Sequence, residues 1–340
     1  MSISAKELAA RLQLSAATVS MVFNNKPGIS EETRYRVMTA ARQYGYVFRN
    51  KAPEAPAENR PVQFIIFKNH GSVVGDTSFF TELMEGIVQS CADIGYLAKV
   101  SYHYADADFD TQADRNGYRG SAGLILLGTE MEAEHLRAFL ALGISTVVLD
   151  AYFEEITADY VVINNVQGAF LATDYLARCG HRTIGYLKSS VPISNFSERA
   201  NGYYNALRRH GIDTSHPYVI PLSPQTEQGY ADMVKYLEGR PPLAGAYFAD
   251  NDIIAAAALR GFARFGYSCP GDVSVIGFDD MPFCELTTPP ISTMRVPKRS
   301  LGRVAVKRLM EKLQLNEDVP VKISTAVRLI ERGSVRKEEP

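Results

Sequence analysis

Three short segments at the start of the chain carry apolar residues at helical spacing. They run from Ser4 to Leu12, from Ser15 to Asn25 and from Ser30 to Gly45. Ser15 and Ser30 stand where a helix N-cap is expected, and Gly45 is a typical C-terminal stop. The pattern therefore predicts three helices joined by tight turns. The residues expected to form their common core are Leu8, Ala9, Leu12, Val19, Val22, Phe23, Val37, Met38, Ala41 and Tyr44.

From residue 62 onwards the pattern changes to short apolar runs separated by amphipathic segments. A first series of runs predicts buried strands at Val62–Phe67, Leu97–Tyr102, Gly123–Leu127, Thr146–Leu149 and Val161–Ile163. A second series predicts strands at Thr183–Leu187, Tyr218–Leu222, Gly245–Phe248 and Val273–Gly277. Helices are predicted near Phe79–Ile94, Met131–Leu142, Ser197–His210, Thr226–Leu237 and Ile253–Phe265. This alternation indicates two α/β lobes with parallel sheets, and the cleft between them is the expected ligand site.

The first two predicted helices have the layout of a helix-turn-helix, whose second helix enters the major groove of DNA. A plain helical hairpin would give a similar pattern. Charge favours the DNA-binding interpretation, because residues 1–60 contain nine Lys and Arg against five Asp and Glu, whereas the rest of the chain contains 27 against 33. A basic head on an acidic body is typical of local phosphate binding.

Composition limits which classes of protein the chain can belong to. The chain has 46% hydrophobic residues but no run of 18 of them and no apolar signal region, so we expect a cytoplasmic protein without a membrane partner. The four cysteines are widely spaced and predict reduced, mostly buried thiols. No phosphate-binding glycine loop, nucleophile elbow or metal-ligand spacing occurs, so we expect no cofactor, no metal and no enzymatic activity.

Several motifs resemble those of the LacI/GalR family of bacterial transcription regulators. In the head these are Thr18-Val19-Ser20, Asn24 to Ser30, Thr33-Arg34 and Gly45-Tyr46. In the body they are Gly180 to Leu187, Arg199-x-x-Gly202-Tyr203, Asn251-Asp252, Gly277 to Asp280, Pro289 to Thr293 and Arg332 to Ser334. The resemblance implies a helix-turn-helix head and a two-lobed effector domain similar to periplasmic sugar-binding proteins, joined by three crossing strands near residues 163, 290 and 324.

The resemblance also implies domain bounds. The head covers residues 1–48, a linker covers 49–61, and the effector domain covers 62–336. Lobe 1 comprises about 62–163 and 291–324, and lobe 2 comprises about 164–290 and 325–336. The linker contains Pro53, Pro56 and Pro61, which oppose a continuous helix, so we predict an extended and mobile segment over residues 49–60.

Roles in the head follow from the same resemblance. Phosphate contacts are implied for Ser4, Ser15, Thr18, Ser20, Asn24 and Ser30. Base-edge contacts are implied for Ala16, Ala17 and Met21. Family members usually carry Arg at the position of Met21. Because Arg is the commonest reader of guanine and Met offers only apolar contact, the operator is expected to differ there.

Candidate effector ligands follow the ends of the predicted strands. The set comprises Asn69, Phe80, Asp150, Asn195, Arg199, Asn251 and Asp279. Carboxylates, amides and an Arg beside an aromatic ring suit the hydroxyls and apolar faces of a sugar. The resemblance singles out Arg199 and Asp279. Asp252 and Asp280 equally fit helix caps, His181 fits a structural hydrogen bond, and one of Phe79 and Phe80 is expected in the core.

These observations predict a homodimeric repressor of carbohydrate genes that binds pseudo-palindromic, double-stranded operator DNA. A small effector, most simply a sugar, would close the lobes and change the spacing of the two heads. A purine nucleobase is the alternative effector. A solute-binding protein of a transport system and a sugar-modifying enzyme are the alternative functions.

Overall fold

The computed structural model describes residues 5–23, 29–43, 60–75, 78–214, 218–315 and 319–337. The chain divides into two compact units, Met1–Ala55 and Pro56–Pro340. Ser4, Asn24 and the linker segment 49–59 lie outside the described residues, so the expectations for them stay predictions. Among the described helices, none combines the length and apolar character needed to cross a membrane.

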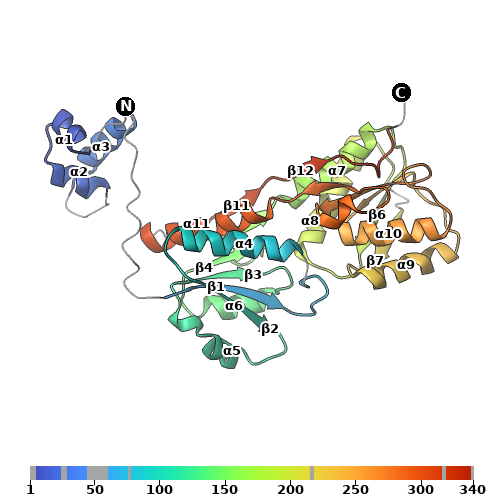
Figure 1. Cartoon of the computed structure of the whole chain (residues 1–340), viewed down its shortest axis with the longest axis horizontal. Helices are drawn as coiled ribbons and strands as arrows, with labels where there is room; N and C mark the ends of the chain where they lie inside the picture. The colour runs from blue at the N-terminus through green and yellow to red at the C-terminus, as the bar shows by residue number, and fades with distance from the viewer. Residues whose placement is uncertain are drawn as a thin grey trace. The chain divides into compact units, whose positions relative to one another are not determined.

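The described part of the first unit contains three helices, which are α1 (Ala5–Leu12), α2 (Ala16–Phe23) and α3 (Glu31–Gln43) (Figure 1). The predicted helices are confirmed over these ranges. Ser15 Oγ accepts a hydrogen bond from the Thr18 amide at 2.9 Å, and Ser30 Oγ accepts one from the Thr33 amide at 3.3 Å, so both serines cap helices as predicted. The core of this small bundle consists of Leu8, Ala9, Val19, Val22, Val37, Ala40 and Ala41.

The first lobe of the second unit is built on a parallel sheet in the order β11-β5-β4-β3-β1-β2. Its strands are β1 (Val62–Lys68), β2 (Ala98–Tyr104), β3 (Gly123–Leu127), β4 (Thr146–Leu149), β5 (Asp159–Ile163) and β11 (Lys322–Thr325). Its helices are α4 (Ser78–Asp93), α5 (Phe109–Asn116), α6 (Ala133–Leu140) and α11 (Lys298–Leu315), with a 3₁₀ turn at Tyr118–Gly120. Helices α4 and α11 pack together over one face of the sheet (Figure 1). Leu136 and Phe139 of α6 pack on the other face.

The second lobe repeats the plan with a sheet in the order β12-β10-β9-β8-β6-β7. Its strands are β6 (Ile184–Ser189), β7 (Val219–Leu222), β8 (Ala246–Ala249), β9 (Ser274–Asp279), β10 (Ser292–Arg295) and β12 (Arg328–Ile330). Its helices are α7 (Asn165–Arg178), α8 (Ser194–Arg209), α9 (Thr226–Glu238) and α10 (Asp252–Arg264), with a 3₁₀ turn at Pro282–Glu285. Only β12 runs antiparallel to its described neighbour, β10. Helix α7 packs on α8, and α9 packs on α10.

The chain crosses between the lobes after Ile163, after Arg295 and after Thr325. The expected boundary near residue 290 is therefore wrong, because β10 pairs with β9 and β12 and so belongs to the second lobe. The segment that returns to the first lobe begins beyond Arg295. The lobe of a short strand is decided by the strands that pair with it on both sides, and the partner β12 lies far along the sequence from β10.

One strand differs in burial from the prediction. The run Leu97–Tyr102 was expected to be a buried strand, but β2 lies at the edge of its sheet, and Leu97 and Tyr102 are 73% and 44% exposed. The apolar pattern identified a strand correctly but could not distinguish a central position from an edge. Helices α5, α7 and α11 and strand β12 had no counterpart among the predicted elements, whereas β10 and β11 lie close to the crossing strands expected near residues 290 and 324.

Candidate functional site

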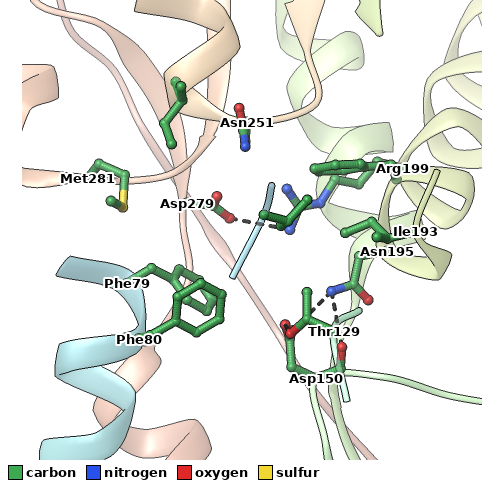
Figure 2. Close-up of a pocket in the computed structure, with 13 residues that line it drawn as sticks. Phe79, Phe80, Thr129, Asp150, Ile193, Asn195, Arg199, Asn251, Asp279 and Met281 are labelled. Carbon is green, nitrogen blue, oxygen red and sulfur yellow. Dashed lines mark hydrogen bonds and ion pairs between the residues drawn. The ribbon is translucent and has the colours of Figure 1, made fainter. Parts of the chain in front are cut away.

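Side chains from both lobes surround a cavity that opens to solvent. Leu127 pairs with Leu149 in the first sheet, so the residues that follow them, Thr129 and Asp150, lie side by side at the carboxyl ends of β3 and β4. The lining residues are Val73, Phe79, Phe80, Thr129, Asp150, Ile193, Asn195, Phe196, Arg199, Asn251, Ile253, Asp279 and Met281 (Figure 2).

The predicted candidate residues converge on this cavity, with one exception. The structure places Phe80, Asp150, Asn195, Arg199, Asn251 and Asp279 in its lining. Asn69 is not among the lining residues. It is exposed, its amide donates to Glu130 at 3.1 Å, and its side chain donates to Glu132 at 3.4 Å. The loop after β1 turns Asn69 away, and another residue of that loop, Val73, lies at the cavity instead.

The Arg199 side chain is almost fully buried, and three of its nitrogens donate hydrogen bonds. Its Nε donates to Asn165 Oδ1 at 2.9 Å, its Nη1 donates to the carbonyl of Asp250, and its Nη2 donates to Asp279 Oδ1 at 3.2 Å. The guanidinium also lies 3.8 Å from the centroid of the Phe278 ring. The side chain is therefore fixed before any ligand arrives, which lowers the entropy cost of binding.

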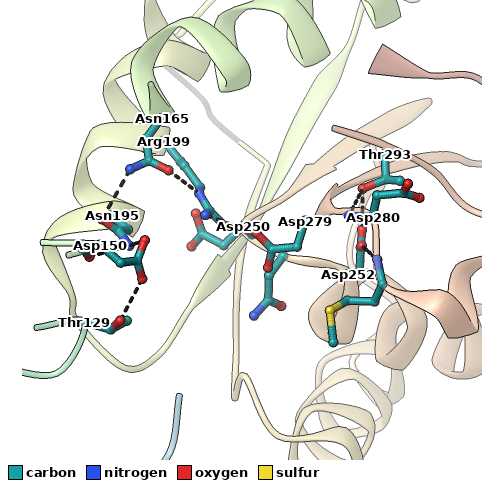
Figure 3. A network of polar contacts seen from close by, with 12 residues as sticks. Thr129, Asp150, Asn165, Asn195, Arg199, Asp250, Asp252, Asp279, Asp280 and Thr293 are labelled. Atoms are coloured by element: carbon teal, nitrogen blue, oxygen red, sulfur yellow. Dashed lines mark hydrogen bonds and ion pairs between the residues drawn. The ribbon is translucent and has the colours of Figure 1, made fainter. Parts of the chain in front are cut away.

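A polar network that includes this arginine connects the two lobes through Asn195 and Asp150 (Figure 3). Thr129 Oγ1 donates to Asp150 Oδ2 at 2.6 Å within the first lobe. Asn195 Nδ2 in the second lobe donates to Asp150 Oδ1 at 3.1 Å and to the Asp150 carbonyl at 3.2 Å. Asn165 Nδ2 donates to Asn195 Oδ1 at 3.2 Å, and Asn165 also accepts from Arg199. A change at the cavity can therefore alter contacts between the lobes.

Burial raises the pKa values of several carboxyl groups in and around the cavity. It raises the pKa of Asp150 to about 6 and the pKa values of Asp250 and Asp252 to about 7. Burial also raises the pKa of Asp279, although Arg199 opposes this shift. Asp150 and Asp279 have positive φ values of 62° and 110°, a region that few non-glycine residues adopt and that often occurs at functional sites.

The structure shows whether Asp252 and Asp280 cap the helices that follow them. Asn251 caps α10, because its Oδ1 accepts from the Ile254 amide at 2.9 Å, and it also lines the cavity. Asp252 is instead buried, and accepts from the Met281 amide and Thr293 Oγ1. Asp280 forms ion pairs with Arg295 and Arg332. Neither Asp252 nor Asp280 caps the helix that follows it.

His181 and the two phenylalanines were the remaining alternatives. His181 Nε2 lies 3.2 Å from the Arg336 carbonyl, in agreement with a structural role. Phe79 is buried as expected for one member of its pair, yet both Phe79 and Phe80 line the cavity, with ring centroids 5.0 Å apart.

Several lining residues were missed from the sequence. They are Val73, Thr129, Ile193, Phe196, Ile253 and Met281. Thr129 follows β3 by two residues and could have been found by the rule that located Asp150. The apolar residues carry no chemical signal that separates a cavity wall from a core.

The head presents part of the predicted DNA-contact set at its surface. Ser15, Ala16 and Ser30 are exposed, and Thr18 and Met21 are half-buried on α2. Ala17 and Ser20 also belong to α2, and their side chains are outside the described part. In a recognition helix the N-terminal residues contact base edges, and the N-terminal residues Ser15 and Ala16 at α2 are exposed here.

Comparison with known proteins agrees with this architecture. Residues 5–48 match the family model described as bacterial regulatory proteins, lacI family, and residues 173–335 match a periplasmic binding protein-like domain. The ribose operon repressor of Haemophilus influenzae is 30% identical over 316 residues, which cover 91% of each chain. The chain belongs to the LacI family. This LacI-family member is therefore a DNA-binding transcription regulator and not an enzyme, as expected from its motifs.

Two further relatives extend the match over nearly the whole LacI-family chain. The HTH-type transcriptional repressor PurR of Escherichia coli O139:H28 is 29% identical over 342 residues, covering 97% of this chain and 96% of its own. The solved complex of the transcriptional regulator CelR with cellobiose superposes with a TM-score of 0.71 at 25% identity, covering 98% of this chain and 99% of its own.

Proposed function

We propose that this LacI-family chain is a cytoplasmic homodimeric repressor whose affinity for operator DNA is set by a sugar bound between its lobes. The observation that carries the proposal is the cavity, where carboxylates, amides and one guanidinium meet three phenylalanine rings. Relatives support both halves of the proposal, since one is named a ribose operon repressor and another is solved with cellobiose.

The chemistry of the lining favours a polyhydroxyl ligand. Each oxygen of an ionised carboxylate can accept more than one hydrogen bond, so Asp150 and Asp279 keep acceptor capacity beyond their present contacts. Sugar hydroxyls can satisfy such acceptors and can also accept from the side-chain amide of Asn251. Phe79 and Phe80 offer rings for the apolar face of a sugar.

A purine nucleobase is the second candidate, because PurR is among the relatives and the Phe79–Phe80 pair could stack on a planar base. A base has fewer hydrogen-bond donors than a sugar, so it leaves more of the acidic lining unpaired. We therefore rank a sugar first.

Recognition of DNA is assigned to the start of α2 and to the helix caps. Ser15, Thr18, Ser20 and Ser30, with Ser4 and Asn24, would position the head on phosphates, and Ala16, Ala17 and Met21 would face base edges. A two-fold dimer fits a pseudo-palindromic operator. The exposed apolar side chains along the β2 edge, which include Leu97, Val100, Tyr102 and Tyr104, offer a surface for the second copy.

Control of DNA binding then follows from two linked equilibria. A sugar that binds both sides of the cleft favours one arrangement of the lobes, which alters the Asp150–Asn195 contact and the geometry of the dimer. Such coupling is typically about 1–3 kcal/mol, and it is reciprocal between sugar and operator.

A ligand screen tests the proposal. The unfolding midpoint of the full chain is measured with ribose, glucose, cellobiose, hypoxanthine and guanine, and each stabilising compound is titrated by calorimetry against wild type and Arg199→Ala. Binding of a sugar that is lost in the variant supports the proposal. Binding of a nucleobase alone would replace the sugar by the second candidate.

A further inference from the structure

The loop between β1 and α4 folds around one buried carboxylate, that of Glu130. Its Oε1 accepts two backbone hydrogen bonds, both at 2.8 Å, and its Oε2 accepts two more, at 2.8 and 3.1 Å. The four donors are the backbone amides of Asn69, Gly71, Val73 and Val74. Amides that converge in this way form a concave anion site, and here the chain fills that site with its own side chain.

The loop is shaped for this contact. Gly71 has a φ of +65°, which brings its amide round to Oε2. The Glu130 side chain has no exposed surface, and His70 Nδ1 lies 3.3 Å from its Oε1. Burial opposes the ionisation of Glu130, but the amide hydrogen bonds and His70 outweigh it and lower its pKa. The group therefore stays a carboxylate at neutral pH.

This filled anion site lies directly beside the cavity. Thr129 precedes Glu130 in the chain and lines the cavity, and Val73, one of the four donors, lines it as well. Amides at the carboxyl end of the first strand of an α/β lobe are a common place for the phosphate of a ligand. In this chain those amides are already occupied.

The other charges at the cavity also disfavour an anion. Arg199 is the one cation among the described lining residues, and its three nitrogens already donate to Asn165, Asp250 and Asp279. Lys298 is buried near Phe79, where its ammonium donates to the Asp280 carbonyl at 3.0 Å.

Asp150 and Asp279 both face the cavity. A ligand phosphate or carboxylate would therefore meet like charges, and the amides around Glu130 are already occupied. We propose that the cleft selects a neutral polyhydroxyl effector and rejects its phosphate ester, and that Glu130 is a positioning residue that occupies the site an anionic group would need. This inference rests on the proposed function, in which a sugar binds in the cleft.

Chemical rescue tests the filled anion site without knowledge of the effector. Glu130→Ala removes the atoms of one acetate ion, so acetate can re-occupy the four amides. We expect sodium acetate, compared with sodium chloride at the same ionic strength, to raise the unfolding midpoint of Glu130→Ala and to leave wild type and the exposed control Glu134→Ala unchanged. Equal responses of the three proteins would overturn the assignment.

Hydrogen exchange provides a second readout if Glu130→Ala does not fold. We expect slow exchange of the amides of Asn69, Gly71, Val73 and Val74 in wild type, and faster exchange in Glu130→Gln, where an NH₂ group replaces one acceptor oxygen. Fast exchange of these amides in wild type would overturn the assignment.

Selectivity is tested with matched pairs of ligands. Calorimetry compares ribose with ribose 5-phosphate and glucose with glucose 6-phosphate. We expect the phosphate ester of the sugar that binds to bind at least about 100-fold more weakly, because like charges in a desolvated site are strongly unfavourable. Equal or tighter binding of the ester would overturn the inference and leave the proposed sugar control intact. If no sugar binds in either form, the proposed function fails, and acetate rescue alone decides the role of Glu130.

Discussion

Asn195 Nδ2 in the second lobe donates a hydrogen bond to Asp150 Oδ1 in the first lobe at a distance of 3.1 Å. Both side chains are buried and both line the cavity (Figure 3). A ligand that competes for either group changes a contact between the lobes at the same time. The site and the control of lobe arrangement are therefore formed by the same residues.

Asp150→Asn should change how stability depends on pH. Burial raises the pKa of Asp150 to about 6, so its favourable contribution is complete below the unfolded value near 3.8 and is lost as pH rises through 6. The asparagine stays neutral throughout. We expect the unfolding midpoint of the variant to rise relative to that of wild type between about pH 4 and pH 7. A constant difference over that range would contradict a buried, ionising Asp150.

Arg199→Ala and Asp279→Ala should each weaken effector binding by about 2–5 kcal/mol, because each leaves a charged partner unpaired in a buried site. Operator affinity without effector should stay nearly unchanged. Calorimetry and anisotropy titrations measure the two quantities separately. Arg260→Ala is a matched control, since this arginine pairs with Glu227 at the surface of the same lobe. Unaltered effector affinity in both cleft variants would refute the site.

Gly202→Ala should destabilise the second lobe. A Cβ at this position would lie 2.2 Å from the Val166 carbonyl oxygen, so α8 must move away from α7. We expect a loss of about 1–3 kcal/mol in the free energy of unfolding, the usual cost of overpacking. In Gly239→Ala the nearest atom to the new Cβ is 3.6 Å away, so denaturant unfolding should show little change. Equal stability of the two variants would disagree with the close approach of the helices.

Met21→Arg should change operator preference at one symmetric pair of positions by about 1–3 kcal/mol, because Arg can donate two hydrogen bonds to guanine. Met21→Leu, which keeps an apolar contact, should leave the preferred bases unchanged. Selection from random duplexes gives both preferences. Identical sites for wild type and Met21→Arg would remove Met21 from the base-reading set.

Sequence patterns located the cleft because parallel strands bring their carboxyl ends to one edge. This rule and the family motifs together found Asp150, Asn195, Arg199 and Asp279, which are about 130 residues apart at the extremes. The rule failed for Asn69, because a loop of several residues can turn any one of them away from the cavity. Here the hydrogen bonds to Glu130 fix the path of the loop.

Other features depend on contacts that no local pattern encodes. The placement of β10 in the second lobe is fixed by pairing with β9 and β12, and the latter lies some 35 residues further along the chain. Ile193 and Met281 look like core residues in the sequence and become wall residues only because the opposite lobe leaves a gap there. Helix α7 was missed since its buried face contains many small residues, among them Gly168, Ala169 and Ala172.

The central claim is that a ligand in the cleft controls DNA binding by the head. The most direct test is an anisotropy titration of a selected operator duplex with the full chain, with and without a saturating concentration of the sugar found in the ligand screen, for wild type and Arg199→Ala. We predict that the sugar changes the operator Kd of wild type by about 5–150-fold, in line with typical coupling energies, and leaves that of Arg199→Ala unchanged. The same operator Kd for wild type with and without bound sugar, or an undiminished sugar effect in the variant, would contradict the account.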